Sequence, residues 1–436
     1  MARLVREDIL RFNIAVVGLG FSGAAVFAKL AAKLPRPASI CLIDAGRLSP
    51  CGAAYSTTRP EHLLNVRAAH MSMDAEVPDD FASWLAGRYQ PHEFAPRMLY
   101  GDYLKQRFNE TMAVAKNAGH QVAYYHDDIR HIDAQAVLHA ASGRRFAARH
   151  VVLASGLRFA PRLSGERVVH PWAFDPAQFA GGQGTVVVAG GGLTAMDMII
   201  SLLRSRFAGR ILCVSPRGHF PMAHDEPGAL PAPAAFPQQL RLSELVRGMR
   251  RYAAKHGQWQ QALDALRPQT SAIWQRLPAV DQKRALTRYL HWWNIHRHRM
   301  APAIAKELGA AESSGQVVRL RGRCVSVGVG QVEIHTHEGR RAVNCDWVFD
   351  CTGPSYASPF SVDMSALMET GAARRHASGA GFAADEHCRI SSEGSPDIYA
   401  MGALLTGQLL ETTAVPELRQ QAATIARAIA LSIPPA

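Results

Sequence analysis

Two glycine-rich segments constrain the fold of this chain more than any other feature. The first, GLGFSG at residues 18–23, follows the apolar run 13–17, and the second, GGGLTA at residues 190–195, follows the apolar run 185–189. Each segment leads into an Ala/Leu/Ile-rich stretch with helical character. A strand, a glycine turn and a helix in this order are typical of a dinucleotide-binding unit, so their double occurrence predicts two such units.

The chemistry of nucleotide binding explains the glycine spacing. The first glycine allows a tight turn, the second lets backbone amides approach a pyrophosphate, and the third position lets the helix pack closely on the strand. The helix N-terminus then faces the phosphate charge. Ordinary strand-to-helix connections also use glycine turns, which is the alternative reading of a single motif. The residues predicted to contact nucleotides are Gly18, Gly20, Phe21, Ser22 and Gly23 in the first turn and Gly190, Gly192, Leu193 and Thr194 in the second.

The end of the next strand distinguishes the two units. In the first unit the apolar run 39–43 is followed by Asp44 and Ala45, and a carboxylate there can accept hydrogen bonds from both hydroxyls of an adenosine ribose. This arrangement favours FAD. In the second unit the run 210–214 is followed by Ser215 and Arg217, a hydroxyl and a cation that suit the 2′-phosphate of NADPH. A solvated loop is the alternative interpretation of these two residues.

The two halves also match beyond their glycine turns. Residues 142–156 recur in pattern at 338–353, which indicates an internal duplication. In each half a segment of alternating character, 121–148 or 317–343, predicts a β-meander that leads into a buried strand. These strands end at Gly156 and Gly353, and we expect both glycines to lie near a nucleotide.

The predicted fold class is α/β, with two Rossmann-like dinucleotide-binding domains, β-meanders and a helical insertion. We expect a discontinuous FAD-binding domain (1–160 plus 340–436) that is completed by a strand at 397–402. An NADPH-binding domain (161–236 plus 309–339) should follow the linker 160–163. Residues 237–308 have helical periodicity and almost no glycine, so they predict a helical insertion that lines the substrate site.

Composition limits the remaining function classes. The 436 residues are 48% hydrophobic and 19% charged, without an apolar run long enough for a membrane span or a signal-peptide core, so we expect a cytoplasmic protein with no membrane partner. The seven cysteines are scattered and contain no CxxC pair, which argues against a disulfide framework and a dithiol reductase. The net charge of +12 is spread over both halves, so we expect no nucleic-acid partner.

The segment 288–302, RYLHWWNIHRHRMAP, combines arginine, histidine and tryptophan to an unusual degree. As one continuous helix it would place Arg288, Trp292, His296 and Arg299 on a common face. The functional interpretation is a substrate-facing wall in which arginine forks bind a carboxylate, and the alternative is a solvated basic helix. His296 and His298 are only two residues apart, so no metal site is predicted.

Several of these segments carry a family resemblance that covers nearly the whole chain. They are residues 17–23, 54–57 with 62–66, the second glycine turn, 293–302 and 411–419. On these motifs the chain resembles a bacterial FAD/NAD(P)-binding two-dinucleotide family that includes nitrosuccinate-forming aspartate N-monooxygenases. It is more distantly similar to ornithine and lysine N-hydroxylases and to class B flavin monooxygenases.

The resemblance implies positions for the flavin. Tyr55 and the segment 62–66 would lie along the isoalloxazine, while Gly402 and the helix that begins near Val415 would lie by the flavin and its ribityl chain. Ala54 and Thr413 are also expected to bind the cofactor. A core loop is the alternative for residues 63–65. The residues predicted to line the substrate cavity are Tyr55, Asn65, Arg288, His296, Arg297 and Arg299.

The resulting hypothesis is an FAD- and NADPH-dependent monooxygenase. A C4a-hydroperoxyflavin would oxygenate a small nucleophilic substrate, and the amine of a carboxylate-bearing amino acid such as aspartate is the first choice. Two alternatives stay open: an NADPH-dependent flavin reductase or dehydrogenase without oxygen insertion, and a flavin redox sensor. The expected partners are a small-molecule substrate and O2, and a homo-oligomer stays open.

Overall fold

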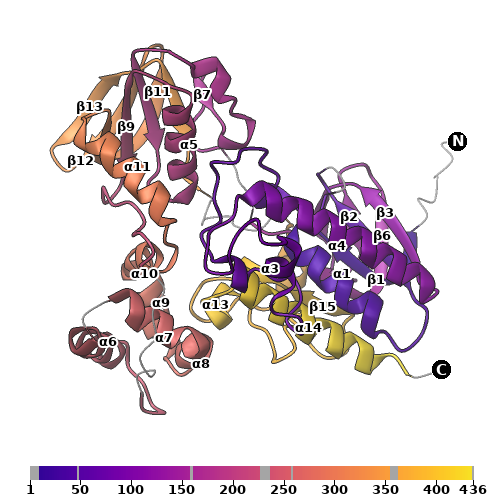
Figure 1. Cartoon of the computed structure of the whole chain (residues 1–436). Helices are drawn as coiled ribbons and strands as arrows, with labels where there is room; N and C mark the ends of the chain where they lie inside the picture. Colours follow the sequence, from indigo (N-terminus) through magenta and orange to yellow (C-terminus); the bar gives the residue numbers. More distant parts are fainter. Residues whose placement is uncertain are drawn as a thin grey trace, which may run out of the picture.

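The computed structural model describes residues 9–46, 49–157, 161–225, 236–256, 259–353 and 362–434. Two α/β units, each built on a parallel sheet, lie beside each other, and a lobe of helices extends from the second unit (Figure 1). The predicted α/β class with Rossmann-like units is confirmed. No helix within the described residues combines the length and apolar character needed to cross a bilayer.

The first unit is built on a seven-stranded sheet. Its parallel part has the order β3-β2-β1-β6, and β15 also pairs with β6 in parallel. Helix α1, which follows the first glycine turn, packs against both α4 and α14. The bounds are β1 (Ile9–Val17), α1 (Phe21–Lys33), β2 (Ser39–Asp44), α4 (Arg97–Asn117), β3 (Gln121–His126), β6 (Arg145–Leu153), β15 (Asp397–Ala400) and α14 (Val415–Ser432).

The meander expected over residues 121–148 is shorter than predicted. Strands β4 (Ile129–Ile132) and β5 (Leu138–Ala140) run antiparallel to each other and continue antiparallel onto β6. Strand β3 instead lies parallel to β2 at the opposite edge of the sheet. The reason is the preceding helix α4, because a strand that returns through a helical crossover pairs in parallel.

The second unit is built on a five-stranded parallel sheet with the order β10-β9-β8-β14-β7. Alternate residues of its central strands point to opposite faces of the sheet and pack in two separate apolar cores. Val186 and Val188 pack with α5 and α11, whereas Val187 and Ala189 pack with Val332 and the rest of an antiparallel meander. The bounds are β7 (Val168–Val169), β8 (Thr185–Ala189), α5 (Leu193–Arg204), β9 (Arg210–Ser215), α11 (Pro302–Ser313), β10 (Val317–Arg321), β11 (Arg323–Gly328), β12 (Gln331–Thr336), β13 (Gly339–Asn344) and β14 (Trp347–Asp350).

Strand pairing corrects two expected boundaries. The boundary at residue 340 falls inside β13, and β14 pairs with β8, so the second unit extends at least to Asp350. Helix α11 begins inside the expected insertion but packs on α5 and β10, and so belongs to the second sheet. Consistent with the duplicated segments, β6 lies beside β1 in one sheet and β14 lies beside β8 in the other.

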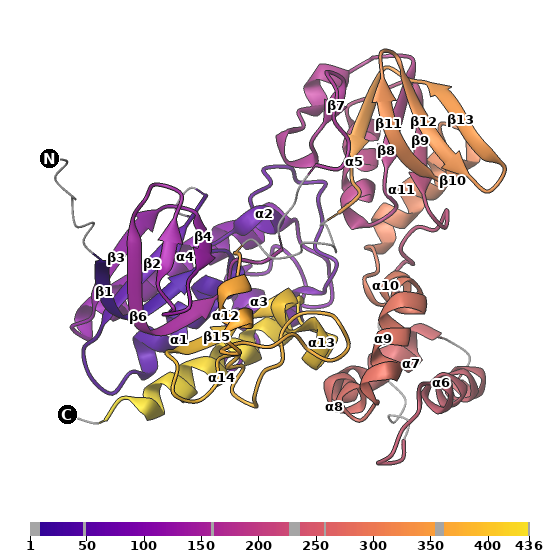
Figure 2. The same ribbon diagram turned by 180° about the vertical axis from the view of Figure 1, so that it is seen from behind.

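The helical lobe has an apolar cluster of its own. Both views show it projecting from the second unit and meeting the first unit at α13 (Figures 1 and 2). Its helices are α6 (Leu242–His256), α7 (Trp259–Leu266), α8 (Thr270–Gln275), α9 (Ala279–Arg288) and α10 (Leu290–Arg297). The remaining helices are α2 (Gly52–Tyr55), α3 (Asp80–Trp84), α12 (Ser365–Glu369) and α13 (Thr406–Leu409), with short 3-10 turns at Ala68–His70, Pro171–Ala173, Pro176–Phe179, Arg267–Gln269 and Gly402–Leu405.

Candidate functional site

The first glycine turn is closed by backbone packing at Gly18 and Gly23 and faces another glycine at Gly20. A Cβ atom on Gly18 would lie 2.6 Å from Ser155 Cα, and one on Gly23 would lie 1.9 Å from Gly18 O. These two glycines are therefore required by close packing of β1, α1 and the end of β6. Gly20 faces Gly52, whose Cα lies 3.5 Å from the position of a Cβ on Gly20. Larger side chains at this point would fill the space over the turn.

Asp44 lies at the end of β2, beside the first glycine turn. Its Oδ1 accepts a hydrogen bond from Leu19 N at 2.8 Å, and its Oδ2 accepts one from Gly46 N at 3.0 Å. Burial raises the pKa of the Asp44 carboxyl, and the two amides oppose that shift. Each oxygen keeps a free lone pair, which is what binding of ribose hydroxyls requires. Ala45 is exposed, and its carbonyl oxygen lies 3.1 Å from His126 Nε2.

The carboxyl ends of β6 and β15 supply two further glycines at the same edge of the sheet. Gly156 has a φ of +68°, and a Cβ atom added to it would have no atom within 4 Å, so the space beside it is open. Gly402 has a φ of +65°, and its N–H donates to Gln421 Oε1 of α14 at 2.8 Å. At the N-terminus of α14, Val415 is buried and Thr413 is exposed. The sheet thus brings these predicted cofactor residues to one edge.

Tyr55 ends the short helix α2, where Ala54 is exposed. Its ring meets the ring of Tyr100 edge to face, with centroids 4.7 Å apart. Burial raises the pKa of Tyr55 to about 12, against the opposing charge of Arg97. The phenol therefore keeps its proton at neutral pH.

The segment 62–66 lies where the first unit contacts helix α5 of the second unit. His62 Nε2 lies 2.9 Å from Ser201 Oγ on α5, and Leu64 is part of the first apolar core. The burial of Leu64 fits the alternative of a core loop for residues 63–65, and the flavin contact of the segment stays a prediction. Asn65 is half-buried, and its carbonyl oxygen accepts a hydrogen bond from His224 Nε2 at 2.9 Å.

The second glycine turn repeats the pattern of the first. A Cβ on Gly190 would lie 2.1 Å from Cys351 O, while a Cβ on Gly192 would have no atom within 4 Å. Leu193 and Thr194 begin α5, and Ala195 is fully buried. Thr194 and Gly353 line one small hollow between the turn and the end of β14. The inner glycine is thus needed for packing, and the outer one faces open space.

The polar residues near the end of β9 include two histidines, His219 and His291, in addition to the predicted Ser215 and Arg217. Ser215 is buried and its Oγ accepts a hydrogen bond from Gly218 N at 3.1 Å, whereas Arg217 is exposed. His219 Nδ1 lies 3.1 Å from His291 Nε2 of α10. Burial, together with the charges of Arg217 and His219, lowers the pKa of His291 to about 4. We did not predict these two histidines, because His291 reaches this position only through the fold of the lobe.

The basic segment 288–302 differs from its prediction. Tyr289 separates α9 from α10, and α10 ends at Arg297, so the single helical face expected for Arg288, His296 and Arg299 does not form. Arg288 is exposed on α9, while His296 lines an apolar cavity inside the lobe.

Arg297 and Arg299 are both engaged by carboxylates of the protein. Arg297 Nη2 lies 3.3 Å from Glu411 Oε2, and both side chains are only 5% exposed. Arg299 forms an ion pair with Asp264 and is itself 3% exposed. These contacts correct the expectation that the two guanidinium groups face a substrate carboxylate. No group of three or more His, Cys, Asp or Glu side chains among the described residues could hold a metal ion.

Contacts between the two units were also beyond prediction. Arg97, at the start of α4, forms an ion pair with Asp197 of α5. Ser201 Oγ, one helical turn further along α5, donates to Glu61 Oε1 at 2.8 Å. These partners are about a hundred or more residues apart, so no local pattern could have identified them.

Comparison with known proteins supports the nucleotide-binding fold. Residues 15–158 match the family model described as FAD-NAD(P)-binding. No curated protein matches the sequence. The fold is similar to that of the reduced ornithine hydroxylase of Pseudomonas aeruginosa, with 15% identity, a TM-score of 0.64 and coverage of 97% of this chain and 99% of that chain.

Two further solved structures share the fold. The L-lysine 6-monooxygenase of Pseudomonas syringae has 16% identity, a TM-score of 0.61 and coverage of 97% of this chain and 100% of that chain. The bacillithiol disulfide reductase of Staphylococcus aureus has 11% identity, a TM-score of 0.59 and coverage of 97% and 99%. The FAD-NAD(P)-binding family model thus covers part of the first unit, and these solved structures share the fold of nearly the whole chain.

Proposed function

We propose that this protein is an FAD- and NADPH-dependent monooxygenase that transfers one oxygen atom from O2 to the nitrogen of a small amine. The observation that carries the proposal is the pair of glycine turns: in each of them backbone packing requires the first glycine, Gly18 or Gly190, and in the second the space beside Gly192 is open. Two solved structures of similar fold, an ornithine hydroxylase and a lysine 6-monooxygenase, have names that state amine substrates and oxygenation.

The first unit fits FAD. The backbone amides at the start of α1, from Gly20 to Ser22, would bind its pyrophosphate, and Asp44 would accept the ribose hydroxyls. The N-terminus of α14, at Val415, would face the flavin and favour negative charge on it. When bound, FAD supplies hydride acceptance and the activation of O2. Tyr55 would hold its proton at Oη and shield the flavin side of the site from water.

The second unit fits NADPH. The start of α5 has the open Gly192 and the hydroxyl of Thr194, which would bind a pyrophosphate. Arg217 is exposed beside Ser215 and would donate to a 2′-phosphate. His219 and His291 would contact the same end of the nucleotide, because they join each other next to Arg217.

The substrate is proposed at the level of its chemical class. A nucleophilic amine is required by the chemistry, and a carboxylate-bearing amino acid such as aspartate is the first we would assay. Arg297 and Arg299 lend no support to a carboxylate, because each is already paired with a carboxylate of the protein. Ornithine and lysine therefore belong in the same panel.

A single assay separates this function from its alternatives. The purified protein, reconstituted with FAD, is incubated with NADPH, O2 and each amine, and the N-oxygenated product and hydrogen peroxide are both measured. A monooxygenase should form product in proportion to the NADPH consumed with one amine. Peroxide alone with every amine would indicate a reductase or dehydrogenase, and no NADPH turnover with any acceptor would indicate a redox sensor.

A further inference from the structure

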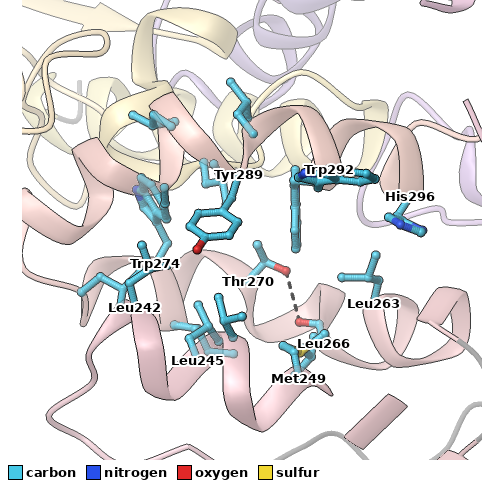
Figure 3. A pocket seen from close by; sticks show the side chains of 18 of the residues that line it. Leu242, Leu245, Met249, Leu263, Leu266, Thr270, Trp274, Tyr289, Trp292 and His296 are labelled. Carbon is cyan, nitrogen blue, oxygen red and sulfur yellow. Dashed lines mark hydrogen bonds between the residues drawn. The ribbon is translucent and has the colours of Figure 1, made fainter. Parts of the chain in front are cut away.

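The helical lobe has an apolar cavity of about 450 Å³ between α6, α7, α8, α9 and α10, and this cavity is open to solvent, with the exposed Trp259, Tyr289 and Trp292 in its lining. In Figure 3 the side chains of Leu245, Trp274, Tyr289 and Trp292 extend from different helices toward one common space. Thr270 is a polar residue of the lining, and its hydroxyl already donates to Leu266 O at 3.2 Å. It therefore needs no hydrogen-bond acceptor from a ligand.

An apolar hollow of this size that is open to solvent calls for an explanation. Contiguous apolar surface of this kind often marks an interaction site or a ligand-binding groove. Cavities of several hundred cubic ångströms with apolar walls are typical of small-molecule sites. The cavity is thus suited to an aliphatic group.

A second hollow of about 460 Å³ adjoins the first and is basic. The two hollows have Leu242, Val246, Arg250 and Tyr289 in common, so they lie side by side. The arginines around the second hollow come from two helices: Arg247 and Arg250 from α6, and Arg284 and Arg288 from α9.

The charge of this arginine group is poorly compensated. Within the described ranges only Arg284 of the four has an acidic partner, Asp281, at 3.4 Å. Asp281 is shared with Arg241, at 3.6 Å, and also accepts a hydrogen bond from Leu242 N. Like charges around one hollow repel each other, and a bound anion would relieve that repulsion. The planar guanidinium fork matches a carboxylate in particular.

We propose that the lobe binds an amphiphilic carboxylate, with its aliphatic chain in the apolar cavity and its carboxylate on Arg250 and the neighbouring arginines. The adjacency of the apolar and the basic hollow, with Arg250 lining both, is what specifies one ligand with both a chain and an anionic head. The chain enters between helices, which favours a single molecule over a membrane surface. The inference does not depend on the proposed oxygenation.

The test is a calorimetric titration of the full chain with dodecanoate, dodecylamine and dodecanol, each below its micelle-forming concentration. We expect saturable one-to-one binding of dodecanoate, and affinity at least tenfold lower for the amine and the alcohol. The Arg250→Ala variant should bind dodecanoate on the order of tenfold more weakly, the loss of about one charge-assisted hydrogen bond. Arg251→Ala is the matched control, because Arg251 is exposed on the same helix but lines neither hollow, and it should bind as the parent does.

A second variant tests the cavity itself. Leu245→Trp should reduce dodecanoate affinity by filling the apolar space, and circular dichroism would verify that the lobe still folds. If that variant unfolds, the comparison of Arg250→Ala with Arg251→Ala still tests whether the lobe binds dodecanoate through Arg250. The inference is overturned by the absence of saturable dodecanoate binding, by equal binding of dodecylamine, by equal effects at positions 250 and 251, or by binding only to vesicles of anionic phospholipid.

Discussion

The imidazole of His62 and the hydroxyl of Ser201 form a buried hydrogen bond, with 2.9 Å between Nε2 and Oγ, that joins the first unit to helix α5 of the second. Ser201 donates its own proton to Glu61 Oε1, so His62 Nε2 must be the donor in this contact. His62 Nδ1 then accepts from Thr57 Oγ1 at 2.8 Å. Burial lowers the pKa of His62, in keeping with this neutral tautomer. The two units are thus held together by a fully partnered polar chain.

Removal of the Ser201 hydroxyl should destabilise the contact between the units. Ser201→Ala leaves the Glu61 carboxylate and His62 Nε2 buried without their partner, at a cost of about 1–3 kcal/mol in unfolding free energy. The measurement is urea-induced unfolding followed by fluorescence. Ser205→Ala is the control, because Ser205 Oγ donates only to Leu202 O within the same helix. Equal losses in the two variants would contradict the account.

The Arg297–Glu411 pair should act on stability. Arg297→Ala would leave Glu411 with one partner, Trp293 Nε1 at 2.7 Å, and should cost on the order of 3 kcal/mol. The exposed Arg288→Ala variant should change stability by less than about 0.5 kcal/mol. The double variant Arg297→Met/Glu411→Leu should recover most of the loss, since it removes both buried charges. Normal stability of Arg297→Ala with a raised KM would contradict this result and support the substrate-binding role that the sequence predicts for Arg297.

Two glycine substitutions separate packing from nucleotide binding. Gly23→Ala should prevent folding of the first unit, because the new Cβ would overlap Gly18 O. Gly192→Ala should keep the parent melting temperature, since the residue has a φ of −90° and open space beside it. Its methyl group would occupy the proposed pyrophosphate position, so KM for NADPH should rise about tenfold or more while FAD stays bound. Unchanged NADPH kinetics would argue against the second nucleotide site.

Stability should fall in mild acid because of His224. Burial lowers the pKa of His224 to about 4, so below its usual pKa of about 6.5 the unfolded chain takes up a proton that the folded chain does not. The folded state therefore loses stability as the pH falls from about 7 to 5, on the order of 1–2 kcal/mol from this group. His224→Gln, which keeps a donor for Asn65 O, should flatten that part of the profile. Substitution of the exposed His337 by Gln should leave the profile unchanged.

The sequence predicted those parts of the fold that depend on local constraints. The two glycine turns were identifiable because Gly18 and Gly190 adopt positive φ and touch backbone, demands that no other residue meets. The position of Asp44 followed from the length of the first βαβ unit. Strand β15 was recognisable as a short apolar run, and it joins the first sheet as predicted, where it pairs with β6.

The parts that could not be predicted depend on contacts between distant residues. The basic segment 288–302 pointed to a substrate wall because its sequence does not reveal that Glu411 and Asp264 neutralise it. The break at Tyr289 has no glycine or proline to announce it. The boundary at residue 340 was misplaced because the sequence of β14 resembles that of β6 in the first sheet. The sequence of β14 does not show that this strand pairs with β8 in the second sheet.

The central claim is that this protein binds two dinucleotides and passes a hydride from one to the other. The most direct measurement reconstitutes the protein with FAD and titrates it with NADPH without oxygen, following the absorbance of oxidised flavin. We predict complete bleaching at one equivalent of NADPH, with much slower bleaching in Gly192→Ala. Protein that retains no flavin, or a flavin whose absorbance NADPH does not change, would contradict the claim.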